Sequence, residues 1–180
     1  MESVGFKEWA LVCEALGRGE QSIILRKGGI AEGRAGFQFQ HREFFLFPTF
    51  FHEQAAKIRT SPAEIPPQGE GEIEINLFAK LEESLMVTSW ETAVVLEPWH
   101  VLQRDVVRER FTYDETPGIY VGVVRIFRMT TPWIIPDLPA YGGCRSWVKL
   151  PIRTNLQMEA VLSDREHAAC LEKFRATVGL

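Results

Sequence analysis

The stretch Gln21-Ser22-Ile23-Ile24-Leu25-Arg26-Lys27-Gly28-Gly29 decides the expected fold of the first half of the chain. Its centre is apolar and rich in β-branched residues, which predicts a strand over 21–26. Two adjacent cations and two glycines follow, so a loop is expected next. A second strand is expected from Phe37, paired with the first strand across that loop.

Outside this stretch, helical patterns mark both ends of the chain. Apolar residues recur at helical spacing near the N-terminus, at Phe6, Trp9, Cys13 and Leu16. Near the C-terminus, Ser163-Asp164-Arg165-Glu166 has the pattern of a capping box, and one apolar face continues after it. A short helix capped by Thr49 is expected over 50–58.

The second half of the chain is mostly strand-like. Strands are expected over 73–87, 93–96, 119–129 and 145–150, separated by turn signals such as Asp114-Glu115-Thr116-Pro117-Gly118. No internal repeat or long linker divides the sequence. The pattern therefore predicts a single α+β domain over 1–180, with a curved or barrel-like mixed sheet flanked by N- and C-terminal helices.

Composition limits the classes of protein that fit this chain. Its 180 residues and 46% hydrophobic content can form a sizeable core, and its net charge of −4 argues against nonspecific coating of nucleic acid. Cations are in excess over 17–45, which fits a local anion site. Cys13, Cys144 and Cys170 have neither disulfide nor zinc spacing, and no segment has the length of a membrane span. A cytoplasmic protein without membrane contact is expected.

Several catalytic motifs are incomplete. His52-Glu53-Gln54-Ala55-Ala56 begins like a zinc-protease helix, but Ala56 stands where the second histidine is needed. Gly28-Gly29 belongs to neither a dinucleotide fingerprint nor a P-loop. No lysine follows a carboxylate two positions earlier, as one large class of metal-dependent nucleases requires. We therefore expect neither a metal nor another cofactor.

Charged and titratable side chains are concentrated between residues 25 and 54. Histidine exchanges protons near neutral pH, and a carboxylate can orient water or stabilise positive charge. The proposed catalytic residues are Glu32, Glu43 and His52. The proposed nucleic-acid-binding residues are Arg26, Lys27, Gly28, Gly29, Arg34, His41, Arg42 and Gln54.

Each of these residues also has an ordinary structural interpretation. The paired cations fit the solvated end of a strand, and Glu32 fits a surface loop. His41 and Glu43 fit an exposed strand face, and the His52 imidazole could donate to a backbone carbonyl. The phenylalanines over 37–51 fit a core better than a base-stacking surface. The sequence alone does not show that the charged segments meet.

The first sixty residues carry a family resemblance. The positions concerned are Trp9 to Leu16, Leu25 to Ile30, Glu32, Phe37, His41, Phe45 to Thr49 and His52 to Gln54. At these positions the chain resembles the bacterial and cyanobacterial family of domain of unknown function 1802, and the resemblance covers nearly the whole chain. That family has no established activity, but some members are joined to a restriction-endonuclease-like domain. The resemblance implies defence against foreign DNA, with a nuclease as an expected partner.

A weaker similarity is to PUA-like domains, which include the ASCH and EVE domains and bind nucleic acids or modified bases. In ASCH domains a glycine and an arginine flank a strand, and Gly19 and Arg26 take these places here. Gln21 and Ile24 replace the lysine and glutamate between them, so the catalytic role of those two groups is not carried over. Gly118 to Ile126 is similar to a late strand of such barrels. The similarity implies a PUA-like fold.

The leading hypothesis is a DNA-directed bacterial defence protein that recognises a base in foreign DNA, including a modified base. The base would be extruded into a pocket, where metal-independent, glycosylase-like hydrolysis could follow. One alternative is a reader that binds the base without cleavage. A further alternative is a regulator that binds a small anion or nucleotide. Neither the base nor the oligomeric state can be inferred from the sequence.

Overall fold

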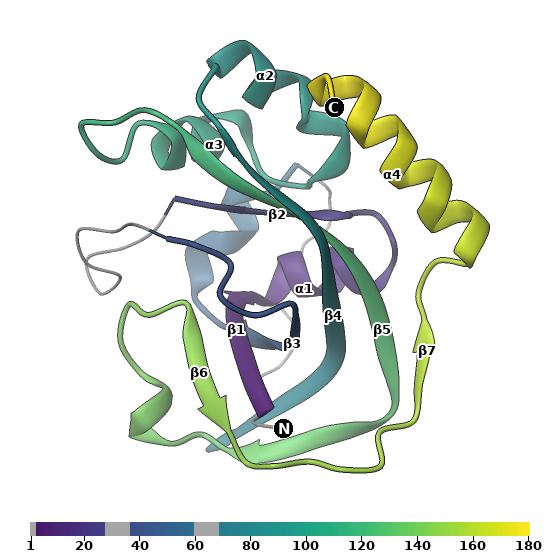
Figure 1. Ribbon diagram of the computed structural model, residues 1–180. Helices are drawn as coiled ribbons and strands as arrows, with labels where there is room; N and C mark the ends of the chain where they lie inside the picture. The colour runs from purple at the N-terminus through teal and green to yellow at the C-terminus, as the bar shows by residue number, and fades with distance from the viewer. Residues whose placement is uncertain (1–2, 28–36, 60–68) are drawn as a thin grey trace.

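A computed structural model describes residues 3–27, 37–59 and 69–180, and Figure 1 shows its course. The strands are β1 (Ser3–Trp9), β2 (Ile23–Arg26), β3 (Glu43–Thr49), β4 (Glu72–Val87), β5 (Ile119–Pro136), β6 (Trp147–Leu150) and β7 (Met158–Ala160). They form one sheet in the order β2-β5-β4-β3-β1-β6, and β7 also pairs with β5. The sheet is mixed because β1 and β3 run parallel, whereas the other pairs are antiparallel.

Helices pack around this sheet. The α-helices are α1 (Ala10–Gly17), α2 (Trp90–Val95), α3 (Arg104–Phe111) and α4 (Asp164–Val178), and the 3₁₀ helices are η2 (His52–Lys57), η3 (Glu97–Trp99) and η4 (Pro139–Tyr141). Figure 1 shows α2 and α3 together at one end of the long strands. Ion pairs from Arg175 to Glu83 and from Arg125 to Asp164 join α4 to the long strands β4 and β5.

The long strands β4 and β5 give the sheet its curvature. Their ladder has register shifts between Ile75 and Leu77 and between Leu81 and Glu83, and such bulges bend a strand pair. Among the described residues, no ladder joins the outer strands β2 and β6. The expected α+β class and curved mixed sheet are confirmed, but the sheet is open and does not close into a barrel.

The N-terminus differs from its sequence pattern. A helix was expected from Phe6, but β1 occupies Ser3–Trp9 and α1 begins only at Ala10. Phe6 is fully buried because β1 pairs with β3 on one side and with β6 on the other. Pairing of β1 with two distant strands therefore determines the local structure here. The helical spacing of the apolar residues predicted the wrong element.

Two further expectations about strands are wrong. Residues 37–42 belong to no strand in the described part of the chain, and β2 pairs with β5 instead of with the segment across the loop. The strand expected over 93–96 is replaced by the end of α2. This helix forms because the Ser89 hydroxyl accepts the backbone N–H of Thr92 at 3.2 Å and so caps its first turn.

Other expected elements are confirmed. β4, β5 and β6 lie where strands were predicted, and β5 extends beyond its expected end. The short helix predicted over 50–58 corresponds to η2. Both hydrogen bonds of the predicted capping box form between Ser163 and Glu166, and α4 buries Phe174 in the core. No helix among the described residues is long and apolar enough to cross a membrane.

Candidate functional site

A cationic pocket lies where α3 and η2 meet the ends of β1 and β2. Its volume is about 250 Å³. The lining residues are Trp9, Arg26, Lys27, Lys57, Val106, Glu109, Arg110 and Tyr113. Four of these eight side chains are cationic and one is acidic, so the local field favours an anion.

The indole ring of Trp9 forms the aromatic wall of the cationic pocket. The Cζ atom of Arg110 lies 4.6 Å from the ring centroid, and the Nζ atom of Lys57 lies 6.0 Å from it. The ring of Phe51 packs edge-on against the same indole at 5.0 Å. Cations within about 6 Å of an indole are attracted by its quadrupole. The Trp9 ring therefore stabilises the positive charges of Arg110 and Lys57 beside the pocket.

Arg110 remains charged although it is largely withdrawn from water. Burial lowers the pKa of Arg110 to about 10, Glu8 opposes this shift, and Arg26 adds to it. The Nη1 atom of Arg110 donates to the backbone oxygen of Leu25 at 2.8 Å. At neutral pH this guanidinium is a fixed cation, since its pKa stays well above 7.

Arg26 lies in the pocket but turns part of its guanidinium inward. Its Nη2 atom donates to the backbone oxygen of Lys7, and its Cζ atom lies 4.7 Å from the centroid of Phe6. Its Nε atom is buried and has no hydrogen-bond partner. The arginine at the end of β2 is therefore more than a solvated strand terminus.

Lys27 is already paired within the protein. Its side chain is 5% exposed, and its Nζ atom lies 3.1 Å from a carboxylate oxygen of Asp114 and donates to the backbone oxygen of Thr116. By contrast, no described residue forms a hydrogen bond or ion pair with the side chain of Lys57. The least compensated cation of the pocket is therefore Lys57, which the sequence reasoning did not select.

Glu8 is a buried carboxylate that the sequence reasoning missed. The residue is 1% exposed, and its Oε1 atom accepts the backbone N–H of Trp9 at 2.8 Å. Its negative charge acts on Arg110, whose pKa it raises. The available signal was strand alternation, because Phe6 and Glu8 occupy alternate positions of β1 and are both buried. The expected helix concealed this alternation.

Three predicted site residues lie elsewhere, in a separate groove at the start of β3. His41, Arg42 and Glu43 line this groove, which has a volume of about 650 Å³ and shares no lining residue with the cationic pocket. The His41 ring contacts that of Trp147, with 4.9 Å between centroids. Glu43 forms a 3.0 Å ion pair with Lys80 on the neighbouring strand.

His52 and Gln54 lie beyond the other end of β3, in η2. His52 is exposed, whereas Gln54 is fully buried. The Gln54 amide accepts the N–H of Leu11 and donates to the oxygen of Phe51, both at 3.1 Å, so it caps α1 and does not face a ligand. A seven-residue strand spans about 20 Å. Glu43 and His52 therefore do not converge on one reacting atom.

Four predicted residues, Gly28, Gly29, Glu32 and Arg34, lie outside the described residues. Within the described ranges, no group of three or more His, Cys, Asp or Glu side chains could hold a metal ion. Of the predicted binding residues that the structure describes, only Arg26 and Lys27 line the cationic pocket.

A family model for a domain of unknown function, DUF1802, matches residues 5–173. The chain belongs to this family. The resemblance seen in the sequence is thereby confirmed, and every lining residue of the cationic pocket lies within the part that matches DUF1802. No curated protein shows significant similarity to this DUF1802 chain.

Among solved structures, the DUF1802 fold is similar to that of ASCH from Zymomonas mobilis. The identity is 13% and the TM-score 0.48, with 96% of this chain and 94% of that chain covered. A variant of that protein with one substitution matches at 13% identity and a TM-score of 0.48, covering 96% and 98% of the two chains. At this identity the likeness concerns the fold alone.

Gln21 and Ile24, which the sequence resemblance set against a lysine and a glutamate of ASCH domains, have structural roles. The Gln21 side chain donates to the oxygen of Ile23 at 2.8 Å and accepts the N–H of Val101 at 3.0 Å. Ile24 is fully buried in the core. Neither side chain lines the cationic pocket.

Proposed function

We propose that the protein binds DNA by holding a nucleotide in the cationic pocket. The observation that carries this proposal is the placement of Arg110 and Lys57 at 4.6 and 6.0 Å from the centroid of the Trp9 ring. Proteins that bind single nucleotides of a strand combine cations for the phosphates with aromatic rings for the bases. Tyr113 also lines the pocket and is 56% exposed, so it adds a second accessible ring.

The contacts of each cation within the protein indicate its role in nucleotide binding. Lys57 can meet a phosphate without losing a hydrogen bond to a described residue. Arg110 is fixed by its bond to Leu25, so its remaining N–H groups are preorganised. Lys27 contributes less than the sequence suggested, because Asp114 already compensates its charge.

Binding without cleavage has more support than base hydrolysis. The hydrolysis hypothesised from the sequence uses a carboxylate and a proton donor at the same glycosidic bond. Glu43 is paired with Lys80 at one end of β3, whereas His52 is exposed beyond the other end. Glu32 lies outside the described residues. We therefore favour a reader of DNA, while base excision and a role in defence remain predictions.

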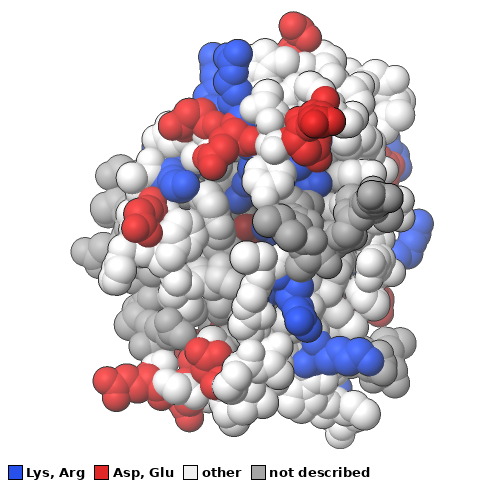
Figure 2. Space-filling view, turned by 90° about the vertical axis from the view of Figure 1, so that its left-hand side faces the viewer, with Lys and Arg blue, Asp and Glu red and all other residues white. Residues whose placement is uncertain are grey.

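A free nucleotide is the second candidate ligand. On the face shown in Figure 2, Lys and Arg side chains lie at several separate places among Asp and Glu side chains. DNA-binding surfaces that follow the phosphate backbone need a continuous run of cations, which the described residues of this face do not form. A mononucleotide would need only the pocket.

Fluorescence anisotropy with a labelled single-stranded oligonucleotide tests the proposal. Lys57→Gln should weaken binding about fivefold, because a phosphate contact is lost. Lys173→Gln is a matched control, since this lysine also lies beside an indole ring, at 5.4 Å from the centroid of Trp99 on another part of the surface. Equal affinities of the two variants would contradict the proposal. Competition by a mononucleotide as strong as that by the unlabelled oligonucleotide would favour the second candidate.

Base excision needs its own test. The protein is incubated with modified and unmodified duplexes, which are then heated in alkali to break the strand at abasic sites. We expect binding without strand breaks. Breaks that require both the protein and the modified base would instead establish hydrolysis and overturn the assignment as a reader.

A further inference from the structure

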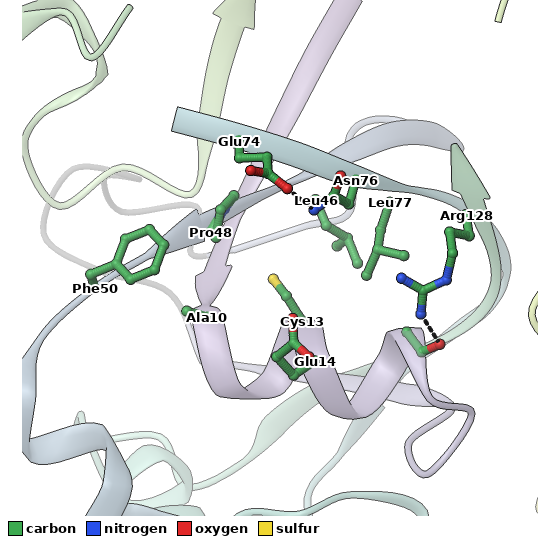
Figure 3. A pocket seen from close by; sticks show the side chains of 11 residues that line it. Ala10, Cys13, Glu14, Leu46, Pro48, Phe50, Glu74, Asn76, Leu77 and Arg128 are labelled. Atoms are coloured by element: carbon green, nitrogen blue, oxygen red, sulfur yellow. Dashed lines mark hydrogen bonds between the residues drawn. The ribbon is translucent and has the colours of Figure 1, made fainter. Parts of the chain in front are cut away.

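A second pocket lies between α1 and the strands β3, β4 and β5, and Figure 3 shows it from close by. We call it the α1 pocket. Its volume is about 210 Å³, and it shares no lining residue with the cationic pocket. Its floor includes Leu46, Leu77 and Cys13, and its charged residues are Glu14, Glu74 and Arg128.

Opposite charges are separated along this pocket. Figure 3 shows Arg128 at one end and Glu74 farther along β4. Arg128 pairs with Leu77 across the β4–β5 ladder, three positions from Glu74, so the two positions lie roughly 10 Å apart. Glu14 of α1 also lines the pocket, but its carboxylate lies 3.6 Å from the guanidinium of Arg18, which compensates its charge. Two long side chains and a small molecule between them can span this separation.

Both charged ends are held in place by hydrogen bonds. The Nη2 atom of Arg128 donates to the backbone oxygen of Gly17 at 2.6 Å, and the Nδ2 atom of Asn76 donates to Oε1 of Glu74 at 2.7 Å. No described residue bonds the second carboxylate oxygen of Glu74 or the Nη1 group of Arg128. Each end therefore offers an oriented charged group to a ligand.

The floor between these ends is apolar. Leu46 is 1% and Leu77 6% exposed, and Figure 3 shows the Cys13 sulfur directed into the same space. Burial raises the pKa of Cys13 well above its usual range, so this thiol is neutral. Phe50 and Pro48 lie at the end opposite Arg128 (Figure 3). Such a lining suits an apolar group.

We propose that the α1 pocket binds a small zwitterion of the class of free amino acids with an apolar side chain. The ligand ammonium would lie at Glu74, its carboxylate at Arg128, and its apolar group on the floor of the pocket. Because Glu74 and Arg128 carry opposite charges and Glu14 is paired with Arg18, the lining has no excess of cations to attract an anionic nucleotide. The proposal is therefore independent of the proposed DNA binding.

Isothermal titration calorimetry with leucine and phenylalanine tests this proposal on the whole chain. Leucinamide lacks the carboxylate, and 4-methylpentanoic acid lacks the ammonium, so each probe loses one charged contact. We expect both to bind at least about tenfold more weakly than leucine, because a charge-assisted hydrogen bond is worth that factor or more. No binding of either amino acid, or equally tight binding of either probe, would overturn the proposal.

Two variants locate the binding in the α1 pocket. Glu74→Gln and Arg128→Gln should each weaken leucine binding about tenfold. Glu172→Gln, on an exposed position of α4, is the control and should not change it. Arg128 also donates to the backbone oxygen of Gly17, so thermal unfolding must show that Arg128→Gln is folded. Glu74 is exposed, so Glu74→Gln should not disturb the fold. Unchanged leucine affinity in Glu74→Gln would contradict the proposed site.

Discussion

One buried amide, that of Gln54, connects η2 to α1 and to the end of β3. It accepts the N–H of Leu11 at 3.1 Å and donates to the oxygens of Phe51 at 3.1 Å and Thr49 at 3.4 Å. Gln54→Met keeps the volume but removes the acceptor of the Leu11 N–H, whereas the oxygen of Phe51 still accepts the backbone N–H of residue 54. We therefore expect a loss of about 1–3 kcal/mol in the free energy of unfolding. Urea unfolding measures this loss. Gln157→Met, at an exposed position, is the control, and an equally small loss in both variants would refute this role.

His100 should make the stability of the fold depend on pH. Burial, with Arg59 adding to it, lowers the pKa of His100 from 6.5 to about 4. The folded state therefore holds a neutral imidazole, whereas the unfolded chain takes up a proton below pH 6.5. The contribution of His100 to the free energy of unfolding is fully present above pH 6.5. It is lost as the pH falls to about 4, and the loss amounts to about 3 kcal/mol.

Urea unfolding at pH 7 and pH 4.5 checks this linkage. His100→Asn keeps an acceptor for the N–H of Leu102, which the Nδ1 atom of His100 binds at 3.1 Å. The wild type should lose more stability between the two pH values than the variant does. The same loss in both would assign the pH dependence to other groups, such as His167, whose pKa burial also lowers.

At the scale of the elements, α4 depends on its capping box. The Ser163 hydroxyl accepts the N–H of Glu166 at 3.3 Å, and the Glu166 carboxylate accepts the N–H of Ser163 at 2.9 Å. Ser163→Ala should lower the free energy of unfolding by about 1 kcal/mol, and Ser163→Gly by only a few tenths. Thermal unfolding compares the two variants. A larger loss for glycine than for alanine would contradict the capping role.

Elements whose determinants are local could be predicted from the sequence, and those set by distant partners could not. Ser163 and Glu166 mark the start of α4 within four residues, and apolar residues mark β4 and β5. β1 carries a helical spacing and becomes a strand because β3 and β6 flank it. The partner of β2 is equally remote in sequence, since Ile23 pairs with Val123.

At the scale of the whole molecule, the same contrast applies to the candidate site. The sequence placed the chemistry between residues 25 and 54, and Arg26 and Lys27 do line the cationic pocket. In the structure, Glu43 lines the separate groove and Gln54 is buried in the interior. The other side chains of the pocket come from β1, η2, α3 and Tyr113 just after α3. Lys57 and Arg110 could therefore be identified as neighbours of Arg26 only from tertiary contacts.

The salt dependence of DNA binding tests the central claim most directly. The affinity of the wild type and of Lys57→Gln for one single-stranded oligonucleotide is measured at several salt concentrations. If Lys57 neutralises a phosphate in the cationic pocket, the wild-type affinity should fall steeply with salt, and the slope of log K against log salt should be smaller by about 0.7 in the variant. A wild-type affinity that does not respond to salt, or identical slopes for the two proteins, would contradict the claim.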